Sequence, residues 1–263
     1  MNQVIAADGP NRDQIEFWNG EAASKWVDFN ALLDRMLEPF SDLAMSHADP
    51  APGGAVAGLD ISAPMLARAR ERADSAAVPV QFINADAETH ALPAASFDLI
   101  FSRFGVMFFA NPKSAFANFH GALKPGGRLA FVCWRAADLN PWVTIPFEAA
   151  RPLSPEFEPV KDDDPGQFAF ARQERVEDIL IDAGFKDIRL EPHDTTQAVG
   201  DGDLDSCVEL MLKLGPVSRL LREADQDAVP AIRQAVRAAV APYHTGRCIE
   251  MAAAVWIVGA RRS

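Results

Sequence analysis

Hydrophobic residues in the first part of the chain recur at helical spacing. Between residues 12 and 47 the large apolar side chains follow one another at steps of three and four positions, which is the period of one helix face. The members of this face are Ile15, Trp18, Ala22, Trp26, Phe29 and Leu33. Pro39 suits a first helical turn and predicts that a new helix begins there. We therefore expect an N-terminal helical cap over 12–47.

From residue 55 onward, short apolar runs alternate with helical segments. The runs 55–61, 78–86, 97–104 and 128–134 read as buried strands, and segments after the first and third run read as helices. Ser62 is a favourable N-cap, and Pro64 fits the first turn of the helix that follows it. This alternation predicts an α/β fold with a mostly parallel sheet and helices on both faces.

The second half of the chain is less regular. The proline-rich, acidic stretch after Trp134 reads as a loop, and a helix over 172–185 and a strand over 186–193 follow it. Residues 203–241 read as helices, and the chain closes with a strand over 252–262. We therefore expect a single domain over 1–263, with a helical lid over 203–241 inserted before the last strand.

Composition narrows the function classes. The 263 residues carry a formal net charge of −12, and a field of this sign repels nucleic acids and anionic membranes. The longest apolar run, 251–260, is about half the length of a membrane span. Three dispersed cysteines form neither a metal-spaced pair nor a disulfide framework, and the first residues do not read as a signal peptide. We expect a cytoplasmic protein that binds no metal, nucleic acid or membrane.

Polar residues at the ends of three predicted strands are the candidates for chemistry. Asp60 and Asp86 end neighbouring strands, where an open α/β sheet binds its ligands. One carboxylate could accept bonds from ribose hydroxyls and the other from an adenine amine. Each could equally be an ordinary helix-start or turn aspartate. Ser102 and Arg103 end the third strand.

The ordered series of these segments resembles the class I S-adenosylmethionine-dependent methyltransferases. It is similar to the small-molecule branch of ubiquinone and menaquinone biosynthesis. The segments are "IEFWNGEAASKWV", "GLDISAPMLARARERA", "NADAETHALPAASFDLIFSRFGVMFF", "LKPGGRLAFVCW" and "AAVWIVGAR". Together they cover nearly the whole chain. The resemblance implies a Rossmann-like fold, S-adenosyl-L-methionine as cofactor and a small-molecule methyl acceptor.

The resemblance also implies roles for single residues. Residues 55–134 would form the cofactor half. Asp60 would hold the ribose hydroxyls with Ile61 against the adenine, and Asp86 with Ala87 would read the adenine edge. Ser102 and Arg103 would lie beside the methionine part of the cofactor. Trp18 and Trp26 would lie on a helix that covers it.

The chain departs from the family pattern at one place. The family's sheet begins with a strand, a glycine-rich loop and a helix, but here "SHADPAP" leads directly to "GGAVAGLDIS". A βα unit of about 25 residues is therefore predicted to be missing. The strand of Asp60 would then either pair with strand 97–104 or leave the sheet distorted. A natural deletion, an error in the recorded sequence and an artificial shortening would all give this pattern.

Methyl transfer is a direct displacement that relies on positioning and needs no nucleophilic side chain. If the acceptor is a hydroxyl, a general base would help, and His193 and His244 flank the lid as candidates. The missing loop also favours an alternative, a catalytically inactive methyltransferase-like binding or scaffold protein. A nicotinamide-dependent oxidoreductase is a second alternative. Such enzymes require a glycine fingerprint after the first strand, and this sequence does not contain one. Catalytic residues and oligomeric state stay open.

Overall fold

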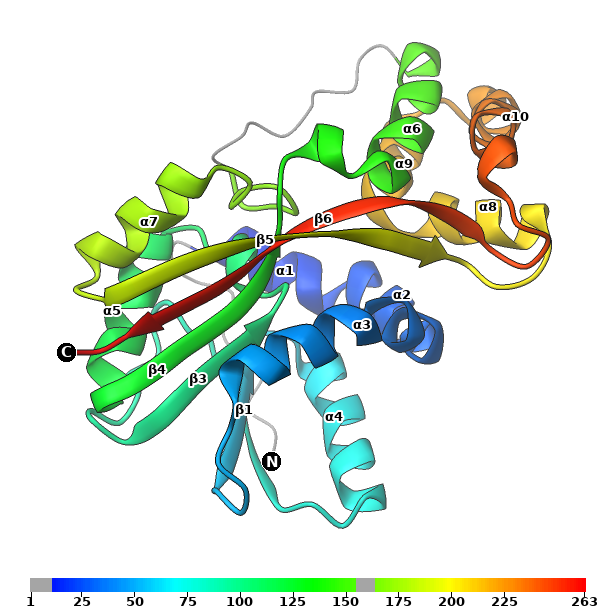
Figure 1. Cartoon of the computed structure of the whole chain (residues 1–263). Helices are drawn as coiled ribbons and strands as arrows, with labels where there is room; N and C mark the ends of the chain where they lie inside the picture. The colour runs from blue at the N-terminus through cyan, green and yellow to red at the C-terminus, as the bar shows by residue number, and fades with distance from the viewer. Residues whose placement is uncertain (1–10, 155–163) are drawn as a thin grey trace.

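The computed structural model describes residues 11–154 and 164–263. Three helices open this part of the chain, strands and helices are interspersed in its middle, and three helices precede the last strand (Figure 1). The helices are α1 (Arg12–Asn19), α2 (Glu21–Asp28), α3 (Asn30–Ala48), α4 (Ala63–Ser75), α5 (Pro112–Ala122), α6 (Pro141–Ala150), α7 (Gln173–Asp182), α8 (Leu204–Lys213), α9 (Gly215–Glu223) and α10 (Val229–Val240). The strands are β1 (Val56–Asp60), β2 (Val80–Asn84), β3 (Phe97–Arg103), β4 (Leu123–Trp134), β5 (Lys186–Val199) and β6 (Ile249–Arg261).

The predicted α/β class is confirmed, and the strands form two sheets. β1 and β2 pair in parallel as a two-stranded sheet, and the second sheet has the order β3-β4-β6-β5. β3 and β4 are parallel, whereas β6 runs antiparallel to both of its neighbours. The four-stranded sheet is therefore mixed, because its closing strand β6 runs opposite to both neighbours.

No strand pairing joins β1 to β3 among the described residues. The predicted alternative in which the Asp60 strand pairs with strand 97–104 is therefore not found. Each of these two strands keeps one edge without a neighbouring strand in the described part of the chain. The absence of a first βα unit, relative to the family pattern, stays a prediction.

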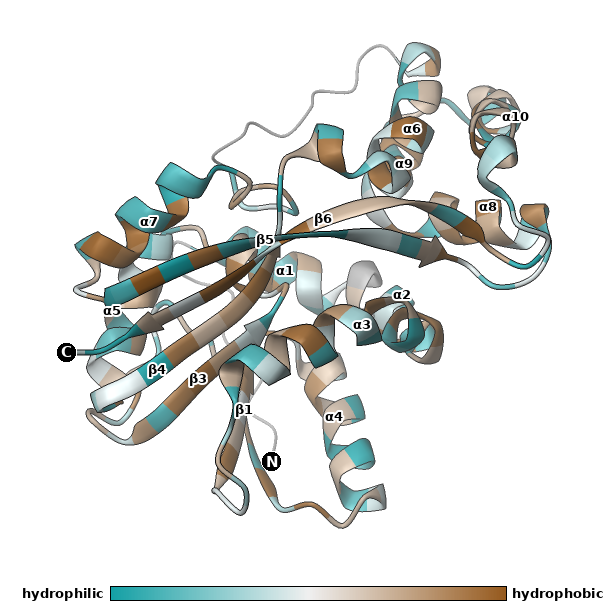
Figure 2. Ribbon diagram, viewed as in Figure 1, coloured by the Kyte–Doolittle hydropathy of each residue, from teal (hydrophilic) through white to brown (hydrophobic). Residues whose placement is uncertain are grey.

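The main sheet is covered on both faces. In Figure 1, α3 lies in front of it and α5 and α7 lie behind it. Figure 2 shows why this sheet needs cover: β3 is mostly hydrophobic, whereas β5 alternates between hydrophilic and hydrophobic residues. The fully buried rings of Phe116, Phe131 and Phe170 belong to the core between α5, β4 and the segment before α7. This sheet supports the end of β3, which borders the candidate site described below.

Three local predictions were wrong. α3 continues through Pro39, because Leu37, Phe40 and Ala44 keep a buried stripe that stabilises the helix against the loss of one hydrogen bond. The stretch after Trp134, predicted as a loop, contains α6. β4 begins at Leu123 rather than at residue 128, and residues 124–127 bulge from it, with Gly126 at a φ of 77°.

The helices α8, α9 and α10 lie between β5 and β6 in the chain. They bury an apolar cluster of their own, which includes Leu220, Ile232 and Val236, and Ala150 of α6 belongs to the same cluster. The division into cap, cofactor half and lid stays a prediction. Within the described residues, no helix combines the length and the apolar character that a membrane crossing requires.

Candidate functional site

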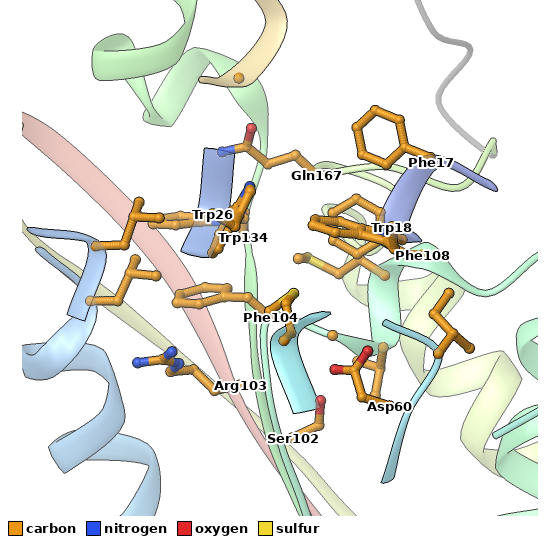
Figure 3. A pocket seen from close by; sticks show the side chains of 18 of the residues that line it. Phe17, Trp18, Trp26, Asp60, Ser102, Arg103, Phe104, Phe108, Trp134 and Gln167 are labelled. Carbon is orange, nitrogen blue, oxygen red and sulfur yellow. The ribbon is translucent and has the colours of Figure 1, made fainter. Parts of the chain in front are cut away.

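A cavity of about 720 Å³ lies where the ends of β1 and β3 meet the N-terminal helices and the helices α6, α8 and α9. Figure 3 shows its wall of aromatic side chains, with Asp60, Ser102 and Gln167 among the polar groups. Its volume falls within the range of roughly 300–1,000 Å³ that is usual for small-molecule sites. The mainly apolar wall with few polar groups is also typical of such sites.

Most of the predicted site residues meet in this cavity. They come from α1, α2, β1, β3 and the turns after β1 and β2. The predicted residues that line it are Trp18, Trp26, Asp60, Ile61, Ala87, Ser102 and Arg103. Asp86 is not among the described residues that line it, although its neighbours Ala85 and Ala87 are.

Asp60 is the last residue of β1, and Figure 3 shows its carboxylate directed into the cavity. The main-chain amide of Ser62 donates to its Oδ1 at 2.7 Å, and Asn84 Nδ2 and the Ala85 amide donate to its main-chain oxygen at 3.0 and 3.1 Å. Burial raises the pKa of Asp60, although hydrogen bonds from the amides of Ser62 and Ile61 oppose this shift. The fold therefore holds a desolvated acceptor at the strand end.

This raised pKa predicts a gain in stability on replacing Asp60. The folded state keeps the Asp60 proton to a higher pH than the unfolded state, so the aspartate lowers stability as pH rises through the two pKa values. We expect Asp60→Asn to melt at a higher temperature than the native chain above the folded-state pKa. The difference should shrink as the pH falls toward the unfolded value. Thermal unfolding followed by circular dichroism between pH 4 and 8 measures this, and a native chain that is the more stable at pH 8 would contradict it.

Asn19 fixes α1 over this strand end. Its Nδ2 donates to the main-chain oxygen of Ile61 at 2.9 Å, and its Oδ1 accepts from the Ala63 amide at 2.9 Å. The preceding residue, Trp18, is thereby placed in the cavity wall, where its ring meets those of Trp26 and Phe108 edge-on at 5.8 and 5.2 Å. Sequence reasoning missed Asn19, because a lone asparagine near a helix end gives no signal of a partner 42 residues away.

Asp86 serves the turn after β2 and the start of α1. Its carboxylate accepts from Asn11 Nδ2 at 3.2 Å, from the Glu88 amide at 2.9 Å and from Thr89 Oγ1 at 3.3 Å. The residue is 5% exposed. These contacts give Asp86 a structural role, and its recognition of adenine stays a prediction.

The end of β3 places Ser102 and Arg103 in the cavity wall. Arg103 reaches toward α3, where its Nη1 donates to Ser41 Oγ at 2.9 Å and its Nη2 lies 3.9 Å from Asp34 Oδ1. Burial lowers the pKa of Arg103 and the charge of Asp34 opposes this. The next residue, Phe104, has a φ of 55°, which is rare for a bulky side chain. In this conformation the Phe104 ring stacks on the Trp134 ring, with 4.4 Å between the ring centroids.

The histidines considered as general bases lie elsewhere. His193 is paired with Val255 inside the β5–β6 ladder, and His244 Nε2 lies 3.1 Å from the main-chain oxygen of Gly202. Neither histidine is among the described residues that line the cavity. The structure therefore gives no support to a base role for either. All three cysteines are buried and free.

Part of the chain is similar to known methyltransferases. Residues 42–131 match the model of a family described as a methyltransferase domain. Demethylmenaquinone methyltransferase of Thermus thermophilus is 40% identical over 88 residues, which are 34% of this chain and 40% of the relative. Aklanonic acid methyltransferase DauC of a Streptomyces species is 36% identical over 110 residues, which are 41% of this chain and 45% of the relative. The chain thus spans less than half the length of these curated relatives.

Solved structures with a similar chain path include the YcgJ protein of Bacillus subtilis, with a TM-score of 0.49, 16% identity and coverage of 79% of this chain and 82% of that one. Another is Haemonchus contortus phosphoethanolamine N-methyltransferase 2 in complex with S-adenosyl-L-methionine. Its TM-score is 0.48 at 18% identity, with coverage of 96% of this chain and 60% of that one.

The family match defines a class for one segment of the chain: residues 42–131 are similar to a methyltransferase domain. The curated relatives that this chain is similar to include demethylmenaquinone methyltransferases.

Proposed function

We propose that this chain transfers a methyl group from S-adenosyl-L-methionine to a small-molecule acceptor. The observation that carries the proposal is the position of Asp60: a desolvated carboxylate at the end of a parallel strand, directed into an aromatic-walled cavity. Ligands of open α/β sheets bind at strand ends of this kind. The curated relatives, whose names specify small-molecule acceptors, support the same proposal.

The residues present fit the nucleoside part of this cofactor. Asp60 would accept hydrogen bonds from the two ribose hydroxyls, while Ile61 and Met65 of the cavity wall would pack against the adenine. Trp18, held by the Asn19 contacts, would close the site against water. Ser102 and Arg103 would face the amino-acid part.

When bound, the cofactor would supply a methyl group on a positively charged sulfur, which the acceptor atom would displace with the carbon–sulfur electron pair staying on sulfur. The protein's part is to align the two reactants and to exclude water, and such alignment can supply several kcal/mol, on the order of 7 or more in favourable cases. The aromatic wall of the cavity suits both tasks.

Calorimetric titration with S-adenosylhomocysteine tests the proposal. We expect the native chain to bind and Asp60→Ala to lose about hundredfold in affinity, because two charge-assisted hydrogen bonds are removed. Asp98→Asn is the matched control, since Asp98 is exposed near the start of β3 and pairs with Lys124. It should bind as the native chain does.

The result that would overturn the proposal is a native chain that melts cooperatively and binds no S-adenosylhomocysteine. Such a result would favour the second candidate function, a methyltransferase-like binding or scaffold protein. The direct passage from α3 to β1 without a glycine-rich loop is the observation that favours this candidate.

A further inference from the structure

The charge of the cavity wall is opposite to that of the whole protein. The chain carries a formal net charge of −12, yet among the described residues that line the cavity there are five cationic side chains and a single acidic one, Asp60. The cationic residues are Lys25, Arg103, Lys213, Arg219 and Arg222. A concave wall focuses such a field inward, so the cavity favours a negatively charged occupant.

The cations are not spread evenly over the wall. Arg103 belongs to the β3 end and is engaged by Ser41 and Asp34 of α3. The other four belong to helices: Lys25 to α2, Lys213 to α8, and Arg219 and Arg222 to α9. Figure 1 shows α8 and α9 on the far side of the N-terminal helices from β1. The three cations of α8 and α9 therefore belong to a different side of the cavity wall from Asp60.

Two of these cations lack a carboxylate partner inside the described part of the protein. The ammonium group of Lys213 lies 5.5 Å from the ring centroid of Phe29, at the junction of α2 and α3, and makes no ion pair with a described residue. Arg222 likewise forms none with any described carboxylate, whereas Arg219 lies 3.5 Å from Glu223. Cations of the cavity wall that no described carboxylate neutralises are available to a ligand.

The wall between the cations and the strand ends is apolar. It includes Trp26, Met36, Trp142, Met211 and Val217. An occupant that contacts both the cationic and the apolar parts of the wall would have an apolar, ring-sized body and at least one anionic group, such as a carboxylate or phenolate. Arginine and lysine bind such oxygen anions by charge-assisted hydrogen bonds, which are stronger than neutral ones.

We propose that the methyl acceptor is an apolar anion, whose negative group is held by Lys213 and Arg222 while its body lies against the aromatic wall. That the anion accepts a methyl group rests on the proposed function, whereas the preference of the cavity for an anion does not depend on it. It also fits the lack of histidine among the described lining residues, because an acceptor that brings its own negative oxygen needs no protein base to become a nucleophile.

The test compares two fluorescent probes of nearly the same shape. One is 1-anilinonaphthalene-8-sulfonate, which is anionic, and the other is N-phenyl-1-naphthylamine, which is neutral. Each is titrated into the native full chain and into Lys213→Gln/Arg222→Gln. The control variant, Lys186→Gln/Arg189→Gln, removes the same charge from exposed positions of β5 outside the cavity.

We expect the Lys213/Arg222 variant to weaken binding of the anionic probe at least about tenfold, the scale of one lost charge-assisted contact. The neutral probe and the control variant should change less than about twofold, because hydrophobic burial is untouched. Added salt should weaken only the anionic probe on the native chain, and this second measurement does not depend on any variant folding. Equal affinities of the two probes, or an equal loss of both in the variant, would overturn the inference.

The same samples are titrated with S-adenosylhomocysteine. Anion selectivity without S-adenosylhomocysteine binding would overturn the methyltransferase function while leaving an anion-selective cavity. Binding of S-adenosylhomocysteine without anion selectivity would overturn only the inference about the acceptor.

Discussion

Replacing Phe116 by alanine is expected to lower the free energy of unfolding by about 3–5 kcal/mol. The ring is fully buried and is surrounded by Phe119, Phe131 and Phe170, with ring centroids 5.6, 5.6 and 5.9 Å away. Truncation removes this burial and the ring–ring contacts and leaves a void that rigid strands cannot close. Urea unfolding followed by tryptophan fluorescence measures the change.

Tyr243→Ala is the matched control for this prediction. Its side chain is comparable in size, but the residue is 39% exposed. We expect a loss of less than about 1 kcal/mol, as for most substitutions outside the core. If the two variants lost equal stability, the aromatic cluster behind the sheet would not be the core that the structure indicates.

Asn140→Leu is expected to destabilise the fold by about 2–4 kcal/mol, because it removes the side-chain oxygen that accepts from the buried Ala254 amide and from Trp142 Nε1. Asn140 is fully buried. Its Oδ1 accepts from the Ala254 amide at 3.0 Å, and its Nδ2 donates to the main-chain oxygens of Ala254 and Ala136 at 3.2 and 3.0 Å. The side chain therefore joins the start of α6 to β6, and leucine can replace its volume but none of these bonds.

The measurement is again urea unfolding, with Gln173→Leu as the control. Gln173 is exposed, and its Nε2 donates to Glu177 Oε1 at 2.8 Å on the same helix, so its loss should change stability by less than about 0.5 kcal/mol. A stability of Asn140→Leu close to that of the native chain would mean that the α6–β6 joint contributes little.

The strands were the most predictable part of the fold. β1, β2 and β3 lie where apolar runs end at turn residues, and periodicity reports such runs directly. α6 was missed because its prolines read as loop signals. Pro141 lies in the first turn, where proline is tolerated, while Val143, Pro146 and Ala150 form a buried face at helical spacing. Burial of this face is a tertiary effect that local propensity does not report.

In the candidate site too, local sequence patterns predicted some residues, whereas others depend on tertiary contacts. Asp60 and Ser102 could be placed from the rule that strand ends carry ligands, and both line the cavity. Asp86 satisfies the same rule in sequence, but the side chain of Asn11, 75 residues earlier, engages its carboxylate. The side-chain hydrogen bonds of Asn19 and Asn140 join segments that are distant in the chain. A single sequence contains the residues of such contacts but no record of their pairing.

The division of the strands into two sheets has a consequence for how a ligand and the fold affect each other. β1 and β3 both line the cavity but share no hydrogen bonds in the described part of the chain. A molecule bound there would contact both sheets at once and act as a brace between them. Because it would bind only when the two are held together, its free energy of binding would add to the cohesion of the whole molecule. The occupant of this cavity would thus serve as a structural member as well as a reactant.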